Sequence, residues 1–157
     1  MQFTLIDLLR PDHILVKDKV SNAQDAIKWL THPLLQSEHV THGFAEDVWK
    51  REQTFPTGLP TQPLAVAIPH ADPDHVNQSA VCIGVLRSPV QFGQMGTDGS
   101  LVLDTRIIFL LAIKEKEKQV GMIQQLITLI QAPSLLEGLI IAKTAQEVID
   151  LVRGTLE

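Results

Sequence analysis

The chain has 157 residues, of which 45% are hydrophobic and 20% are charged, and its formal net charge is −5 at pH 7. This length predicts a single domain over residues 1–157 that buries a core of its own. The sequence contains no stripe of lysine or arginine, and phosphate recognition needs a concentrated cationic surface. The composition therefore argues against nucleic acid as a partner.

Two further features bear on the compartment. The sequence has no run of about 18 apolar residues, and residues 1–4 lack the basic start of a signal peptide. Cys82 is the single cysteine, and it lies in an apolar run where we expect it to pack in the core. We expect a soluble, cytoplasmic protein without membrane insertion.

The N-terminal third predicts two helices. The first covers residues 22–30, with Ser21 and Gln24 as an expected capping box, and Pro33 should end it or start the next turn. The second covers residues 44–53 and brings Arg51 and Glu52 to its last turn. Its expected inward residues are Phe44, Val48 and Trp49.

Three strand candidates follow, at residues 64–68, 79–86 and 105–113. They are rich in β-branched residues and almost free of polar alternation, which indicates strands covered on both faces. Residues 90–92 are a candidate short edge strand, followed by a turn-rich stretch over 93–100.

The last third of the chain is predicted to be helical. Its expected apolar face consists of Val120, Ile123, Ile127 and Ile130. Residues 134–137 and 144–147 each read as a capping box before an apolar stretch. Helices on both sides of the strands in the sequence predict an α/β fold, a sandwich of a mixed β-sheet flanked by helices on both faces.

Histidine and aspartate residues cluster at the end of the first strand candidate. In the run over residues 64–71, His70 comes just after a proline. Asp72, Asp74 and His75 lie within the next five residues. An ordinary strand-end histidine would fit this pattern as well. A polar cluster of this density costs stability if it is buried without purpose, so we consider two chemical interpretations.

The first interpretation is a metal-dependent hydrolase that uses His70, Asp72, Asp74 and His75. This stretch is close to the His-x-His-x-Asp-His run of metallo-β-lactamase-like hydrolases, with an aspartate in place of the second histidine. Such sites draw further ligands from distant segments. The other four histidines of this chain all fall in or beside the N-terminal helices.

The second interpretation is a phosphoryl carrier. A neutral, exposed histidine on a rigid support can accept a phosphoryl group, and a nearby arginine can stabilise the equatorial oxygens. His70 and Arg51 fit these parts. The sequence has no glycine-rich nucleotide loop of the Walker type, so the donor would be another protein.

The residues that support the second interpretation resemble a known family. Arg51-Glu52, Thr57-Gly58 and the run over 64–71 are similar to the signature of fructose/mannitol-class enzyme IIA domains of the bacterial phosphoenolpyruvate-dependent sugar phosphotransferase system. The likeness continues in order to residues 144–149 and covers nearly all of the chain. It implies that His70 accepts a phosphoryl group from phospho-HPr and passes it to a cysteine of enzyme IIB, which serves a membrane IIC permease. It implies no cofactor and no metal.

The resemblance also implies roles for the neighbours of His70, with Arg51 and Glu52 at the site. Mannitol- and fructose-type members carry a second histidine where Gln119 stands here. Galactitol-type members are similar to this chain in lacking it and in having a histidine at the place of His75, so we expect a galactitol-like system. A regulatory module of the same fold, phosphorylated for signalling without a IIB partner, is an alternative.

Overall fold

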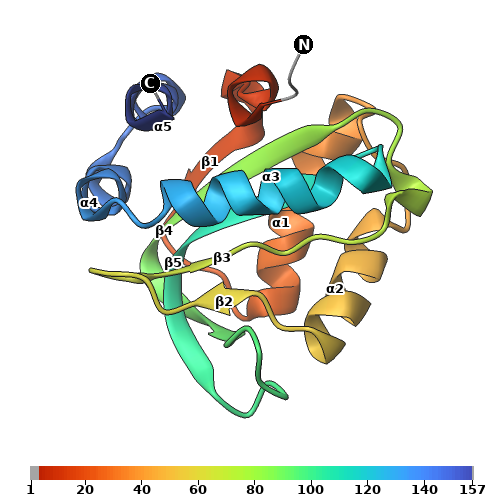
Figure 1. Ribbon diagram of the computed structural model, residues 1–157, viewed down its shortest axis with the longest axis horizontal. Coiled ribbons are helices and arrows are strands. Elements are labelled where there is room, and N and C mark those ends of the chain that lie inside the picture. Colours follow the sequence, from red (N-terminus) through yellow and green to blue (C-terminus); the bar gives the residue numbers. More distant parts are fainter. Residues whose placement is uncertain (1–3, 157) are drawn as a thin grey trace.

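A computed structural model describes residues 4–156, and these residues form a mixed sheet with helices on both faces (Figure 1). The sheet has the strand order β1-β4-β5-β3-β2. β1 is parallel to β4 and β3 is parallel to β5, whereas β4–β5 and β2–β3 are antiparallel. The strands are β1 Ile14–Lys17, β2 Gly58–Leu59, β3 Ala65–Ala67, β4 Ala80–Gly93 and β5 Val102–Ala112.

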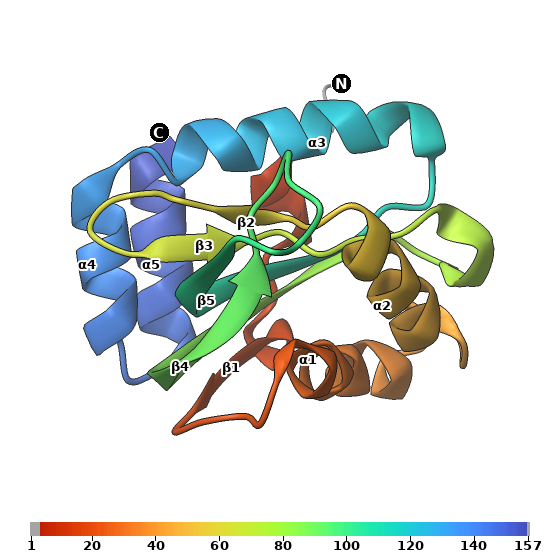
Figure 2. The ribbon, with the colours of Figure 1, turned by 90° about the horizontal axis from the view of Figure 1, so that it is seen from below.

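Five α-helices cover the sheet in two groups (Figure 2). Helices α1 and α2 lie on one face, and α3, α4 and α5 lie on the other. They are α1 Ala23–Gln36, α2 Phe44–Thr54, α3 Lys116–Leu129, α4 Pro133–Ile141 and α5 Ala145–Leu156. Three short 3-10 helices, η1 Leu5–Leu8, η2 Pro11–His13 and η3 Pro73–His75, complete the described elements.

The two faces of the sheet bury separate cores. On β5, Phe109 and Leu111 point to the side of α3–α5, whereas Ile108 and Leu110 point to the side of α1 and α2. Cys82 is fully buried in the core under α1 and α2, as expected. The strands are apolar throughout because helices cover both faces of the sheet, as the sequence predicted.

The structure corrects the prediction of a separate edge strand at residues 90–92. These residues are the second half of β4, and Val90 pairs with Thr105 of β5 after a register shift between Val85 and Val90. The polar residues 87–89 therefore mark an irregularity within one long strand rather than a break. The short strands β1 and β2 were not predicted.

Two expectations for the N-terminal helix also need correction. The N-cap of α1 is Asn22, whose side chain accepts a hydrogen bond from the Asp25 N–H, so the predicted box at Ser21 and Gln24 is wrong. Pro33 lies inside α1, which continues to Gln36. Burial of Leu34 in the core offsets the hydrogen bond that the proline cannot donate.

In the C-terminal third, the core-facing side of α3 differs from the predicted side. Met122, Leu126 and Leu129 are buried, whereas Val120 is 64% exposed. The reason is that Gln119, a polar residue, takes the inward position of the first turn. Ile123 and Ile127 are only partly buried, and Ile130 is buried at the C-cap.

The two predicted capping boxes of this third differ in outcome. Helix α4 begins at Pro133 with Ala132 as its N-cap, so the box predicted from Ser134 is wrong, because a proline at the first helical position sets the start. At α5 the Thr144 hydroxyl accepts the Glu147 N–H as expected, although Glu147 reaches back to the Lys143 N–H. Among the described residues, no helix is long and apolar enough to cross a membrane.

Candidate functional site

His70 lies just beyond the end of β3, beside the end of the central strand β5. The Leu111 N–H of β5 donates to the Pro69 carbonyl at 3.0 Å, and His70 itself bridges to Leu111. The backbone of His70 therefore extends the β3–β5 pairing beyond Ala67. This pairing gives the imidazole the rigid support that the sequence pattern indicated.

The imidazole of His70 has one occupied and one free nitrogen. Nδ1 lies 2.8 Å from the Ile68 carbonyl oxygen, and because a carbonyl only accepts, Nδ1 carries the proton. Nε2 has no hydrogen-bond partner in the described part of the chain, and it is not among the fully enclosed polar atoms. In the neutral ring Nε2 therefore holds an accessible lone pair.

The expectation that His70 is exposed needs correction, because the residue is only 6% exposed. The ring turns back onto the Ile68 carbonyl instead of standing out from the strand end. Burial lowers the pKa of His70, and the Arg51 charge lowers it further, against the opposing effects of the Ile68 hydrogen bond and Asp72. The ring is therefore neutral at neutral pH, as a nucleophile must be.

Arg51 supplies a cationic group with unused hydrogen-bonding capacity. It lies in the last turn of α2, and its guanidinium stacks 5.3 Å from the centre of the Phe55 ring. Its Nε is buried and has no hydrogen-bond partner within residues 4–156. Buried N–H groups normally have partners, so an orphan donor on a cation indicates a place for an anion.

A small hollow of about 200 Å³ lies beside Arg51. Ala71, the residue after His70, forms part of its wall, so the hollow and the phosphoacceptor candidate are adjacent. The other residues of the wall are Asp47, Lys50, Arg51, Asp72 and Asp74.

Glu52 lies at the site but is not part of the wall of the hollow. Both of its carboxylate oxygens are bound by Thr57, one by the backbone N–H at 2.8 Å and the other by the hydroxyl at 2.9 Å. The Thr57 hydroxyl in turn accepts the Ile68 N–H at 3.1 Å. Glu52 thus acts on His70 through Thr57 and Ile68, and burial raises its pKa to about 7. Thr57 was part of the motif found in the sequence, but its role was not predicted, because the contact to Ile68 exists only in the fold.

His75 is connected to the hollow by a hydrogen bond to Asp47, which forms part of its wall. Its Nδ1 bonds to Asp47 Oδ2, and its ring lies against Gly43, the N-cap of α2, whose φ is +107°. Sequence reasoning missed Asp47 as a site residue. A signal was present, because Asp47 and Arg51 are four residues apart and so share one face of α2.

Gln119 also acts on the loop after His70. Its side chain is buried, and Nε2 donates to the Ala71 carbonyl at 2.9 Å. The amide therefore ties the first turn of α3 to the residue that follows the candidate phosphoacceptor.

The four residues of the metal alternative do not converge. Asp72 forms an ion pair with Lys116 at 3.7 Å, and His75 is bound to Asp47. Within residues 4–156, no three histidine, cysteine, aspartate or glutamate side chains are arranged to hold a metal ion. The metal-hydrolase alternative therefore has no ligand set in the described chain.

Comparison with known proteins identifies the family. The sequence profile of the family described as "Phosphoenolpyruvate-dependent sugar phosphotransferase system, EIIA 2" matches residues 7–154. The chain belongs to this family. It is also 28% identical over 121 residues to the galactitol-specific EIIA component of Escherichia coli K12, covering 74% of this chain and 78% of the relative. It is therefore an enzyme IIA of the type-2 class, a phosphocarrier of a sugar phosphotransferase system.

Solved structures share the fold of this enzyme IIA. A chain in the complex of enzyme IIA and phosphorylated enzyme IIB of the E. coli mannitol system aligns with a TM-score of 0.76 at 23% identity, covering 93% of this chain and 97% of that chain. The nitrogen regulatory protein IIA-Ntr of Neisseria meningitidis aligns with a TM-score of 0.76 at 23% identity, covering 94% of this chain and 98% of that one. Both confirm the predicted α/β sandwich.

Proposed function

We propose that Nε2 of His70 accepts a phosphoryl group from phospho-HPr and passes it to a cysteine of enzyme IIB. The observation that carries this proposal is the Nδ1 bond to the Ile68 carbonyl, because it leaves the Nε2 lone pair as the nucleophile. We treat residues 1–157 as one enzyme IIA unit that works in the cytoplasm together with its protein partners.

The transfer balances without a separate proton acceptor. Nε2 attacks phosphorus, a P–Nε2 bond forms, and the bond from phosphorus to the HPr donor breaks, leaving its electron pair on HPr. The proton stays on Nδ1, which keeps donating to the Ile68 carbonyl, and the ring becomes cationic. In the second step the IIB thiolate forms a P–S bond, and the P–Nε2 electrons return to His70.

The neighbours of His70 divide into two roles. Arg51 is the residue that contacts the phosphoryl oxygens, since it lines the hollow and its guanidinium has no hydrogen-bond or ion-pair partner among the described residues. Glu52, Gln119 and His75 are positioning residues, because the Glu52 carboxyl is bound by Thr57, Gln119 Nε2 donates to the Ala71 carbonyl and His75 Nδ1 bonds to Asp47.

We infer that the sugar system is of the galactitol type. The support is the similarity to a galactitol-specific EIIA component, together with Gln119 at the place where a second histidine is expected in mannitol- and fructose-type members. The partners of this chain are then a galactitol-type IIB and, through it, a membrane IIC permease.

Intact-protein mass spectrometry after incubation with phosphoenolpyruvate, enzyme I and HPr tests the first transfer. We expect one phosphoryl group on the wild type and none on His70→Ala, because no other described histidine has this geometry. His42→Ala, which removes an exposed imidazole, is the matched control and should be fully phosphorylated. A full adduct on His70→Ala would refute the acceptor assignment.

Adding purified IIB to the phosphorylated chain tests the second transfer. We expect rapid loss of the phosphoryl group to galactitol-type IIB and slower loss to mannitol-type IIB. A chain that is phosphorylated on His70 but passes the group to neither IIB would instead support the regulatory alternative.

A further inference from the structure

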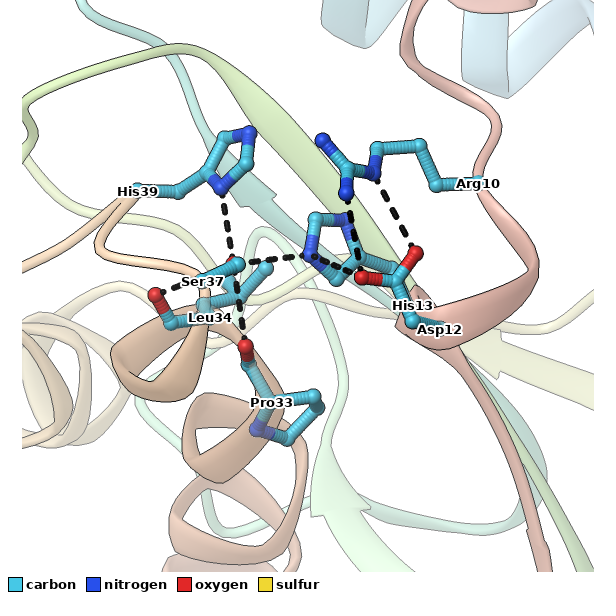
Figure 3. Close-up of polar contacts among 7 residues, drawn as sticks. All are labelled: Arg10, Asp12, His13, Pro33, Leu34, Ser37 and His39. Atoms are coloured by element: carbon cyan, nitrogen blue, oxygen red, sulfur yellow. Dashed lines mark hydrogen bonds and ion pairs between the residues drawn. The ribbon is translucent and has the colours of Figure 1, made fainter.

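A second group of buried imidazoles lies away from His70, where the C-terminal end of α1 meets η2 (Figure 3). His13 has no exposed surface and His39 is 5% exposed, and their ring centroids are 4.9 Å apart. The Ser37 hydroxyl lies between them, 3.0 Å from His13 Nε2 and 2.7 Å from His39 Nδ1. We call His13, Ser37 and His39 the histidine cluster.

The hydrogen bonds of the cluster suit neutral rings. The Ser37 hydroxyl has one proton to donate, so at least one ring must donate to Oγ. The hydroxyl also lies 3.0 Å from the Pro33 carbonyl, which can only accept. In every arrangement His13 Nδ1 stays buried without a partner in the part of the chain that the structure describes. A proton added there would be a buried charge with no acceptor.

The charged groups around the cluster do little to offset this cost. On the side of η2, Arg10 binds both oxygens of Asp12 at 3.2 Å, so the Asp12 charge is already paired. Asp12 Oδ2 is 3.9 Å from His13 Nε2. Burial is the main cause that lowers the pKa of both rings, Arg10 lowers both further, and Asp12 opposes it. On the side of β4, burial raises the pKa of the Cys82 thiol, which stays neutral.

The cluster is connected by backbone bonds to the segment that carries His75. The His39 carbonyl accepts the Asn77 and Gln78 N–H groups at 2.8 and 3.1 Å. The Thr41 N–H donates to the His75 carbonyl at 2.9 Å. Residues 75–78 therefore rest on the turn that follows α1, and His75 from this segment binds Asp47 in the hollow beside Arg51.

We propose that the histidine cluster is a proton-sensitive anchor for residues 75–78, which holds this segment while both rings are neutral and releases it when either ring takes up a proton. Ser37 and His39 are then positioning residues for the phosphoryl site, and acidification slows phosphoryl acceptance. The effect on phosphoryl transfer rests on the proposed function, whereas the effect on the segment does not.

Amide hydrogen exchange of Asn77 and Gln78, followed by NMR between pH 7.5 and 5, tests the anchor directly. Unfolded or released rings titrate near 6.5, above the pKa of the buried rings. Each coupled ring therefore makes opening up to about tenfold easier per pH unit below 6.5. After correction for the intrinsic exchange rate, we expect protection of both amides to fall over this window. The fall should begin below pH 6.5 and level off at the pH where His13 and His39 titrate in the folded protein, observed in the same samples.

The variant that tests this cause is His13→Gln with His39→Asn. These amides place N–H donors near the positions of His13 Nε2 and His39 Nδ1 but do not titrate, so protection should persist at pH 5. His32→Asn, which replaces an exposed histidine of α1, is the matched control and should behave as the wild type. Ser37→Ala should lose protection even at pH 7.5, because the hydroxyl that joins the rings is gone.

Equal pH dependence in the wild type and the double variant would overturn the proposal. If the double variant does not fold, the wild type alone decides, because protection that stays constant below pH 6.5, or that keeps falling below the pH where both folded rings titrate, overturns it as well. Failure of the proposed function is a separate result, seen as a missing phosphoryl adduct at every pH. Failure of the anchor is a normal adduct with exchange that does not respond to the cluster.

Discussion

At the scale of single residues, the site presents Nε2 of His70 as a nucleophile and places the Arg51 cation beside it. The Ile68 carbonyl fixes the tautomer, while burial and Arg51 keep the ring neutral. Arg51 lines the hollow and keeps a buried Nε–H without a partner among the described residues, so a small movement of its side chain would offer this donor to a group that arrives later.

Arg51→Ala should therefore slow phosphoryl acceptance about a hundredfold, the size of effect seen when one preorganised donor to a developing charge is removed. Arg51→Lys should recover only part of the rate, since an ammonium keeps the charge but not the forked donor geometry. Single-turnover phosphorylation by phospho-HPr measures both. Arg153→Ala, an exposed residue of α5, makes the same change in net charge and should leave the rate unaltered. Equal rates for Arg51→Ala and the wild type would exclude this role.

Glu52→Gln tests the buried carboxyl through stability. The native pKa of Glu52 is about 7, above its ordinary value of 4.5, so the native state holds the proton more tightly between these values. The free energy of unfolding contributed by Glu52 therefore falls as pH rises through this window, by about 3 kcal/mol at most. Glutamine does not titrate, so the free energy of unfolding of the variant should rise relative to that of the wild type from pH 5 to pH 8. Urea unfolding measures this difference.

The amide can replace the carboxyl, because its oxygen can accept the Thr57 N–H while its NH2 donates to the Thr57 hydroxyl. Glu46→Gln on the exposed face of the same helix is the control, and its curve should run parallel to that of the wild type. Parallel curves for Glu52→Gln as well would show that Glu52 is not a titrating buried group.

At the scale of elements, α2 organises the site from both of its ends. Its first turn holds Asp47, which binds His75, and its last turn holds Arg51 and Glu52. The helix begins at Gly43, where φ is +107° and an added Cβ would lie 2.8 Å from His75 Nε2. Both the backbone angle and the imidazole require glycine at this position.

Gly43→Ala should destabilise the protein by about 1–3 kcal/mol, because an L-residue is strained at this backbone angle. The same change should displace His75 and alter its NMR signals. Gly121→Ala is the matched control: Gly121 lies within α3 with open space around it, so alanine there should stabilise the helix by about 0.5–1 kcal/mol. A Gly43→Ala protein as stable as the wild type, with His75 unmoved, would contradict the requirement for glycine at the start of α2.

Long, uninterrupted apolar runs were the elements that the sequence predicted well. The candidates at 64–68, 79–86 and 105–113 became β3, β4 and β5, because a short run of continuous apolar, β-branched residues is typical of a strand buried on both faces. β1 and β2 are too short to carry a pattern. The inward side of α3 was predicted wrongly because Gln119, which binds the Ala71 carbonyl, is polar yet buried.

At the scale of the whole molecule, the site is assembled from segments far apart in the chain. His70 and Arg51 could be found in the sequence because the chemistry depends on their residue types. Thr57 and Asp47 could not be assigned in the same way, because their roles consist of contacts to Ile68 and His75. The burial of His70 depends on a rotation of its ring toward Ile68, which no sequence pattern records.

The two-sided core explains why these contacts hold. Helices α1 and α2 cover one face of the sheet, and α3 to α5 cover the other (Figure 2). His70 sits beside the central strand β5 with support from both layers. α2 delivers Arg51 and Glu52 from one side, and α3 delivers Gln119 from the other. Residues from both helical layers would therefore surround a phosphoryl group on His70.

Histidine-resolved ¹H–¹⁵N NMR of the labelled protein, before and after phosphorylation by phosphoenolpyruvate, enzyme I and HPr, is the decisive experiment for the role of His70. We expect His70 to be neutral with its proton on Nδ1 before the reaction, and phosphorus to be bonded to Nε2 afterwards. Phosphorus on Nδ1 of His70, or on any other histidine, would contradict the proposed transfer.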